Sequence, residues 1–386
     1  MLNAVRLIYD LRVRAIIYQI MAVGGVLFLG WYLYSNVVTN LSDKNIATGF
    51  AYLQREAGFA ISTQLIPFKG SDSYGRALIV GILNTFHVSV LGIFLATVIG
   101  LVVGVARLSS NPLLARLMLL YVEFLRNVPL LLQLFLWYSI IIFTLPNVRQ
   151  ALQPIPYVYL SNSGLVVPSL NWSAAKTGVL ACFILGIIAA FLYRRAAIAS
   201  RISTGIERRI WPMMLAALAV PTLIGLLVFQ PNWSIDWPEA GRFRLSGGST
   251  LTPEFTALLV GLALNASASI AEIVRSGIQS VKKGQWEAAQ ALGLQKGEVM
   301  RKVVLPQGLR VMIPPLTSSY LSLFKNSSLA VAIGYPDLVM VSTTTMNQTG
   351  QAIEGIAIFM GVYLSISISI SLFMNWYNAH VALKGR

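Results

Sequence analysis

Two pairs of ionisable residues within apolar segments are the groups in this sequence most able to do chemistry. Glu123 and Arg126 lie in YVEFLRNVPLLLQLF, and Glu272 and Arg275 lie in NASASIAEIVRSG. Both pairs have the i, i+3 spacing that places two side chains on one helix face, where the two charges can neutralise each other. Ionisable groups in long apolar segments are rare and often functional. Each pair is therefore either a packing element or part of a polar pathway or gate.

Other polar residues in apolar segments point to a cavity. The run from Lys325 to Ser328 places four polar residues where only protein partners or a water-filled cavity can satisfy them. Asn265 lies among small residues, which also permit close helix packing. Pro129 has no N–H and would leave one backbone carbonyl of its helix free. We predict a substrate pathway or gate at Glu123, Arg126, Pro129, Asn265, Glu272, Lys325, Asn326 and Ser327.

The motifs of common enzyme active sites are missing from the sequence. It contains no GxxxxGK[ST] phosphate loop and no HExxH, GxSxG or CxxC pattern. The single cysteine, Cys182, excludes a disulfide framework, and the two histidines, His87 and His380, are far apart in the chain. We therefore predict no catalytic residue, no cofactor and no metal site in this chain. If ATP drives its function, a partner chain must bind the ATP and Mg.

The most informative segment is a polar, basic loop from Gly284 to Gln307, GQWEAAQALGLQKGEVMRKVVLPQ, which lies between two apolar segments. Its alanines predict a short helix over 286–292. Glu287 is expected in the first turn of this helix, where a carboxylate suits the positive end of the helix dipole. Gly293 fits a left-handed C-terminal cap, and Pro306 is expected to end a second, amphipathic helix.

A small helix with an alanine face, exposed below a membrane domain, suits a groove on another protein. The alternative is an amphipathic helix that lies on anionic lipid, as basic cytoplasmic loops often do. Glu287 and the alanines would make a poor lipid-facing surface. We therefore favour a docking element for a separate protein.

Composition gives the fold class. The chain has 386 residues, of which 56% are hydrophobic and only 11% charged, and the apolar residues form long runs. This pattern predicts an all-α, polytopic membrane protein. We expect about eight transmembrane helices, at approximately 15–35, 77–106, 117–145, 177–193, 211–229, 254–275, 310–332 and 352–378.

The distribution of charge gives an orientation. The net charge of +15 does not require a nucleic-acid partner, because most Lys and Arg residues fall in alternate loops, as the positive-inside rule describes. Arg6, Arg12 and Arg14 precede the first span, and Lys384 and Arg386 follow the last. Both termini are therefore expected in the cytoplasm.

Two external segments have local patterns of their own. Residues 49–61 form either an amphipathic surface helix or an ordered connecting loop. Residues 334–353 mix apolar and hydroxyl residues, which suggests a short re-entrant or surface helix before the last span.

The loop resembles the signature loop of ABC importer permeases. The matching residues are Glu287, Ala288, Ala289, Gly293, Val303, Leu305 and Pro306, with valine where isoleucine is commonest. The resemblance assigns ATPase coupling to Glu287, Ala288, Ala289, Gly293, Leu305 and Pro306.

Neighbouring segments are similar to the polar amino-acid branch of these permeases, which includes histidine and glutamine permeases. They include EIVRSGI at 272–278, LPQ at 305–307, IPP at 313–315 and KNSSL at 325–329. The segment RNVPLL at 126–131 departs from the usual Arg-Gly-Thr-Pro pattern.

The resemblance implies a type I permease core of five helices with three extra helices. The expected divisions are an extra helix and periplasmic segment at 1–76, core at 77–145, an insertion with two helices at 146–253, and core at 254–386 with the coupling loop at 276–309. An extended permease of this kind is most like the larger permease subunit of a general L-amino-acid transporter. It implies ABC ATPase subunits, a second permease subunit, a periplasmic amino-acid-binding protein and a bacterial inner-membrane location.

Two other functions remain as alternatives. An ion- or proton-coupled secondary transporter would need a central carboxylate and paired repeats, for which Glu123 is a weak candidate. A receptor or assembly scaffold would bind partners without transporting anything.

Overall fold

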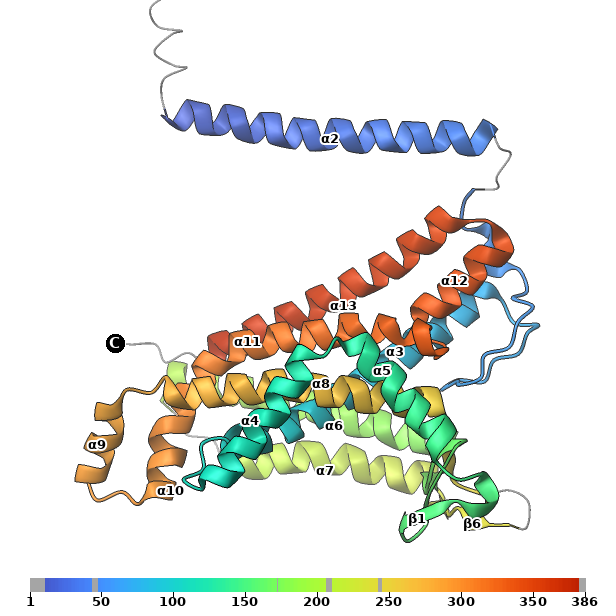
Figure 1. Ribbon diagram of the computed structural model, residues 1–386. Coiled ribbons are helices and arrows are strands. Elements are labelled where there is room, and N and C mark those ends of the chain that lie inside the picture. The colour runs from blue at the N-terminus through green and yellow to red at the C-terminus, as the bar shows by residue number, and fades with distance from the viewer. Residues whose placement is uncertain (1–10, 44–47, 172, 206–209, 242–244, 382–386) are drawn as a thin grey trace, which may run out of the picture. The chain divides into compact units, whose positions relative to one another are not determined.

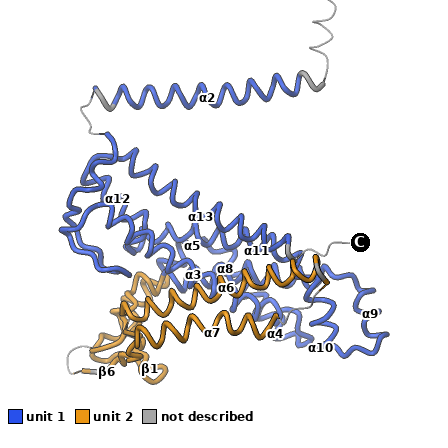
Figure 2. The backbone as a smooth tube through the Cα atoms, turned by 180° about the vertical axis from the view of Figure 1, so that it is seen from behind, with its two compact units in different colours: residues 1–135, 258–386 blue, residues 136–257 orange. Residues whose placement is uncertain are grey.

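The computed structural model describes residues 11–43, 48–171, 173–205, 210–241 and 245–381 (Figure 1). It forms two compact units, the first made of 1–135 and 258–386 and the second of 136–257 (Figure 2). Arg6, Lys384 and Arg386, which contribute to the predicted orientation, lie outside the described residues. The cytoplasmic placement of the termini remains a prediction.

Membrane-spanning helices dominate the described residues. Six of these helices are long and apolar enough to cross a membrane. They are α2 (Leu11–Asp43), α3 (Tyr74–Ala106), α6 (Ala174–Thr204), α7 (Ile210–Phe229), α8 (Pro253–Gln279) and α13 (Ala352–Val381). Two bent pairs of helices bring the number to eight if each pair is one span. The prediction of about eight spans and a helical fold is confirmed.

The first bent pair corrects the prediction of one continuous helix over 117–145. Helix α4 (Pro112–Asn127) and the segment Leu130–Thr144, which starts with α5 (Leu130–Ser139), meet at an angle of 103°. The break falls at Val128 and Pro129, where a proline N–H is missing and the residue before proline avoids the helical conformation. Val128 has an extended backbone, with φ −93° and ψ 125°.

The second bent pair contains the predicted short helix before the last span. Helix α11 (Leu305–Asn326) continues as a 3₁₀ segment, Ser327–Ile333, and is followed by α12 (Leu338–Thr349). The Asp337 side chain accepts a hydrogen bond from the Met340 N–H at 2.8 Å and so caps α12. Leu338 and Val341 of α12 are buried in one apolar cluster with Tyr52.

That cluster also explains the segment 49–61. Only Ala51–Gln54 forms a helical turn, of 3₁₀ type, and the rest is an ordered loop. Tyr52, Ala57 and Ile61 are buried in the cluster, so tertiary packing rather than helix periodicity fixes the segment.

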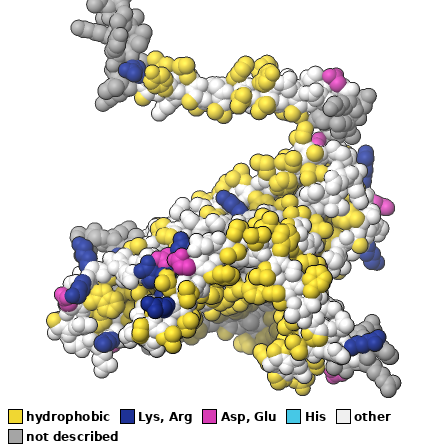
Figure 3. All heavy atoms as spheres, viewed as in Figure 1, with side chains coloured by type: hydrophobic (Ala, Val, Ile, Leu, Met, Phe, Trp, Pro, Cys, Tyr) yellow, Lys and Arg dark blue, Asp and Glu magenta, His cyan; other side chains and the backbone are white. Residues whose placement is uncertain are grey.

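Close helix contacts organise the first unit around α3 and α8. A Cβ added at Gly100 would lie 2.9 Å from the Ser267 carbonyl oxygen, and one at Gly104 would lie 2.8 Å from that of Ala271. Two glycines four residues apart therefore let the two backbones approach closely. On the face seen in Figure 3, hydrophobic side chains cover much of the middle of this unit's helices, while most Lys and Arg lie toward the helix ends.

The second unit contains the α6–α7 hairpin and small sheets that the sequence analysis did not predict. Strands β1 (Leu152–Ile155), β2 (Val158–Ser161), β3 (Gly164–Val167) and β8 (Ser249–Leu251) form one antiparallel sheet in that order. Two shorter ladders pair β4 (Ser169–Leu170) with β5 (Ile235–Asp236) and β6 (Glu239–Ala240) with β7 (Leu245–Ser246). The sequence SNSG at 161–164 lies between the strand-like runs VYL and LVV, and this pattern is the local signal from which a β-hairpin could have been predicted.

Candidate functional site

The short helix predicted in the loop is α9 (Lys283–Ala291), and Gly293 follows its end as predicted. Gly293 has φ +80°, a left-handed conformation that glycine adopts without strain. Its N–H donates to the Gln290 carbonyl at 2.9 Å, and the Leu294 N–H donates to the Ala289 carbonyl at 3.3 Å. These two bonds form a Schellman motif, which turns the chain sharply after α9.

The side chains of α9 face in different directions. Ala289 is buried, with 3% of its surface exposed, whereas Ala288 is exposed. Leu292, directly after α9, is 83% exposed and lies in the loop between α8 and α11. Glu287, Ala288 and Leu292 are therefore among the exposed residues on α9 and directly after it, and Leu292 was not among the residues predicted from the sequence.

Glu287 does not lie in the first turn of α9, because the helix begins earlier than the predicted 286. Its carboxylate instead faces the Lys283 ammonium group, with 3.5 Å between Oε1 and Nζ. Both side chains are well exposed, so this pair contributes little to stability. The Glu287 carboxylate is therefore available to a partner chain.

Pro306 does not end the second helix of the loop, contrary to the prediction. Helix α10 (Lys296–Val299) leads into a π-helical segment, Met300–Val304, and then directly into α11. Pro306 lies in the first turn of α11, where proline is tolerated, and the wider π turn precedes it. Leu305 and Pro306 therefore belong to a continuous helical connection between the loop and the span.

Glycines hold the base of this loop together. A Cβ added at Gly308 of α11 would lie 2.9 Å from the Gly277 carbonyl oxygen of α8. A Cβ added at Gly277 would overlap the Met312 side chain, at 2.2 Å from Cγ. The two helices that carry the loop, α8 and α11, therefore touch at its base. Figures 1 and 2 show α9 and α10 at the same end of α8 and α11.

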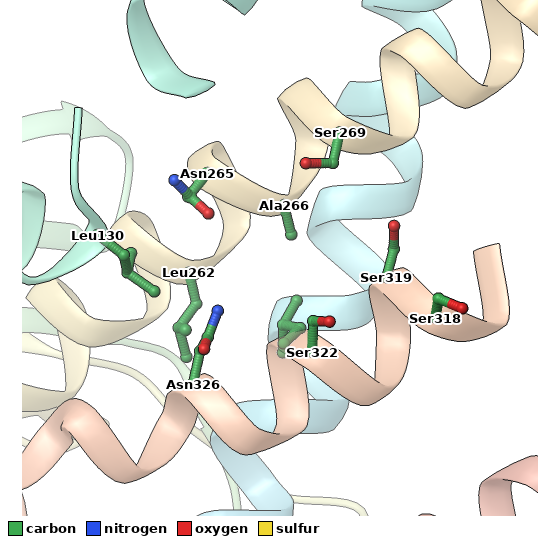
Figure 4. Close-up of a pocket in the computed structure, with 10 residues that line it drawn as sticks. Leu130, Leu262, Asn265, Ala266, Ser269, Ser318, Ser319, Ser322 and Asn326 are labelled. Atoms are coloured by element: carbon green, nitrogen blue, oxygen red, sulfur yellow. The ribbon is translucent and has the colours of Figure 1, made fainter. Parts of the chain in front are cut away.

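A small polar cavity lies between α8 and α11, beside the start of α5 (Figure 4). Its volume is about 170 Å³, and none of the described residues that line it is charged. Asn265 and Ser269 of α8 face Ser319, Ser322 and Asn326 of α11 across it. Neutral amides and hydroxyls of this kind can both donate hydrogen bonds to a carboxylate and accept them from an ammonium group.

The bend between α4 and α5 forms part of the same site. Pro129 supplies no N–H to the Leu125 carbonyl, which in a continuous helix would be its partner. The Leu125 oxygen instead accepts hydrogen bonds from Gln133 Nε2 at 2.9 Å and from Asn265 Nδ2 at 3.2 Å. Gln133 also donates to the Val128 carbonyl at 2.9 Å. The free carbonyl expected from Pro129 is therefore present, and Gln133, which the sequence analysis missed, satisfies it.

Glu272 belongs to a group of three charged side chains at one end of the α3 and α8 pair. It accepts hydrogen bonds from Arg275, its predicted partner, and from Arg107, directly after α3. The Arg107 side chain is only 9% exposed. This ionic triad of Arg107, Glu272 and Arg275 links α3 to α8 next to the coupling loop and lies outside the cavity.

The remaining predicted pathway residues do not line the cavity. Glu123 and Arg126 are exposed on α4 and form no ion pair with each other; Glu123 accepts a hydrogen bond from Asn127 at 3.3 Å. Lys325 lines another cavity, of about 500 Å³, with Tyr363 of α13. Ser327 is fully buried and donates to the Phe324 carbonyl at 2.7 Å.

Comparison with known proteins gives this arrangement a family. A family model described as "Binding-protein-dependent transport system inner membrane component" matches residues 183–384. The general L-amino acid transport system permease protein AapQ of Rhizobium johnstonii is 45% identical over 98% of this chain and 94% of its own length. The chain belongs to this permease family.

Two further relatives of this permease align over nearly their whole length. The putative amino-acid ABC transporter permease protein YhdX of Escherichia coli K12 is 45% identical over 97% of this chain and 95% of its own length. The glutamate/glutamine/aspartate/asparagine transport system permease protein BztB of Rhodobacter capsulatus is 39% identical over 98% of this chain and 96% of its own length.

Membership of this ABC permease family decides between the functions left open by the sequence. The chain is a membrane-embedded translocation subunit, and the ATPase activity of such a transporter lies in a separate partner subunit. Nothing in the comparisons supports ion-coupled secondary transport. The coupling role of the loop at 284–307 remains a prediction.

Proposed function

We propose that this permease carries L-amino acids across a bacterial inner membrane, with ATP-binding subunits that drive it from the cytoplasm. Its partners would be ABC ATPase subunits, a second, different permease subunit and a periplasmic amino-acid-binding protein. Its termini, α9 and α10 would lie in the cytoplasm. The observation that carries the proposal is α9, an exposed helix between two spans that touch each other at Gly277 and Gly308 and also line a polar cavity.

Substrate passage would use the cavity between α8 and α11. A zwitterionic amino acid carries both an ammonium and a carboxylate group, and the cavity supplies neutral groups that suit each of them. Since no charged side chain of the described residues lines the cavity, the side-chain charge of the substrate is not selected there. This supports a broad range of amino acids, with the selection made by the binding protein.

Coupling would be mechanical. ATP-driven closure of the ATPase dimer would move α9 through contacts to Ala288, Leu292 and Glu287. Because α9 follows α8 after only a few residues and α10 continues into α11, its movement would tilt both walls of the cavity together. The ionic triad would carry the same movement to α3.

Isolation of the intact complex tests this proposal. A tagged copy of the chain, purified from its native membrane in mild detergent, should bring down an ATPase with a phosphate loop and a second permease in fixed stoichiometry. Replacing Leu292 by Asp should release the ATPase and retain the second permease, while the matched change Leu294→Asp, beyond the turn, should have a smaller effect. Recovery of the chain alone, or of the ATPase in equal amount with Leu292→Asp, would contradict the proposed docking.

A further inference from the structure

The α6–α7 hairpin of the second unit carries an apolar groove that no part of the transport proposal uses. The groove has a volume of about 350 Å³ and its lining includes Ile187, Ala190, Phe191, Trp211 and Leu218. Its lining runs along α6 from Ile187 to Arg194, roughly 10 Å at 1.5 Å per residue. This length covers the passage from the hydrocarbon region to the headgroup level of a membrane.

Arginine side chains place positive charge at one end of the groove. Arg194 lines it, and Arg195 follows with its guanidinium 5.0 Å from the centre of the Phe191 ring. Neither α6 nor α7 contains an Asp or Glu residue. The end of the groove therefore has a positive charge that no carboxylate of its own two helices neutralises.

A tryptophan, Trp211, also lines the groove, as expected if this end of the hairpin lies at the membrane–water interface. Trp211 lies in the first turn of α7 and is 76% exposed. Tryptophan is enriched at the headgroup level of membranes, where its ring contacts acyl chains and its N–H contacts polar groups. The groove thus combines an apolar floor, an aromatic rim and a cationic end.

We propose that this groove is a specific binding site for an anionic phospholipid. One acyl chain would lie along Ile187, Ala190 and Leu218, and the phosphate would accept hydrogen bonds from Arg194. Charge complementarity identifies the ligand, because a basic pocket between transmembrane helices attracts anionic headgroups more than zwitterionic ones. The bound lipid would anchor the inserted hairpin, independently of which substrate the permease carries.

Native mass spectrometry of the purified transporter complex tests the site. The complex is exchanged into detergent with phosphatidylglycerol or phosphatidylcholine, and the lipid retained per chain is measured. We expect phosphatidylglycerol to be retained about fivefold more than phosphatidylcholine, and Arg194→Gln to remove this preference. Arg201→Gln, on the same helix but outside the groove lining, is the matched charge control and should keep the preference.

A second pair of variants tests the apolar part of the groove. Ala190→Phe fills the floor, whereas Ala189→Phe adds the same side chain to an exposed position of α6 outside the groove lining. We expect only Ala190→Phe to reduce retention of both lipids. Equal retention of the two lipids by the native chain would overturn the proposal, as would equal effects of Arg194→Gln and Arg201→Gln. Cross-linking of a Leu215→Cys variant to the second permease through the new thiol would also overturn it, because protein would then cover the groove.

Discussion

Asn265 of α8 donates a hydrogen bond from Nδ2 to the carbonyl oxygen of Leu125 on α4, at a distance of 3.2 Å. The acceptor is the carbonyl that Pro129 leaves free, and the donor is a residue that lines the polar cavity. The bend of the α4–α5 span and the wall of the cavity are therefore joined through one side chain. A movement of α8 would change the bend and the cavity together.

The first prediction concerns Gln133. Gln133→Leu removes both hydrogen bonds that the Gln133 amide donates. The Val128 carbonyl then loses its Gln133 donor, and of the two side-chain donors to the Leu125 carbonyl only Asn265 remains. An unsatisfied buried polar group costs about 1–3 kcal/mol, so thermal unfolding in detergent should occur at a lower temperature. Asn265→Ala should lower the unfolding temperature less, because Gln133 still donates a hydrogen bond to the Leu125 carbonyl. A larger effect for Asn265→Ala would show that the bend depends mainly on α8.

The second prediction concerns the turn after α9. Apart from its two chain neighbours, no described residue has an atom within 4 Å of a Cβ added at Gly293, so its positive φ is what restricts the residue there. Gly293→Val should cost roughly 1–3 kcal/mol of backbone strain and abolish uptake in a correctly inserted chain. Gly293→Asn should retain substantial uptake, since asparagine tolerates the left-handed region. Gly297 does not have a positive φ, so the control variant Gly297→Ala should transport normally. Normal uptake by Gly293→Val would refute the coupling role of the turn.

The third prediction concerns the base of the loop. Gly277→Ala forces its methyl group against the Met312 side chain and should destabilise the purified protein by about 1–3 kcal/mol. Adding Met312→Ala should recover part of this loss, because the three nearest atoms all belong to that flexible side chain.

Gly308→Ala provides the contrasting case at the loop base. Its nearest neighbour is the Gly277 backbone oxygen, so Met312→Ala should not restore the stability of this variant. Unfolding temperatures of the two single and two double variants measure the difference. Equal rescue in both backgrounds would mean that α8 and α11 do not touch through their backbones here.

The fourth prediction concerns the ionic triad. Glu272→Gln leaves Arg107, whose side chain is 9% exposed, without its carboxylate and should cost more stability than Arg275→Gln. In the double variant Arg107→Gln/Glu272→Gln, the total loss should be smaller than the sum of the single losses by about 0.5–3 kcal/mol. Strict additivity in thermal unfolding would show that the two side chains do not interact.

The sequence predicted the turn at Gly293 and the spans well because both depend on local signals. Hydrophobic runs define spans by length, and Gly293 fits a cap that its own backbone conformation confirms. Pro306 misled the prediction because a π turn ahead of it allows α11 to continue through it. The local rule that proline ends a helix takes no account of that wider turn.

Side-chain pairing between distant segments was predicted less well. Glu272 and Arg275 were paired through their spacing, but Arg107 is 165 residues away in sequence and gave no local signal. Gln133 acquires its role only because the chain bends back over Pro129. Glu123 and Arg126 share the same spacing, yet they do not pair on an exposed helix face, where Glu123 accepts a hydrogen bond from Asn127 instead.

ATP-driven uptake by the reconstituted transporter tests the central claim most directly. The chain and its co-purified partners are placed in proteoliposomes with a protonophore, and entry of labelled L-amino acids is measured with ATP on the ATPase side. We predict uptake that requires ATP and the binding protein, resists the protonophore and disappears with Gly293→Val. Uptake that persists without ATP and collapses with the protonophore would contradict the account.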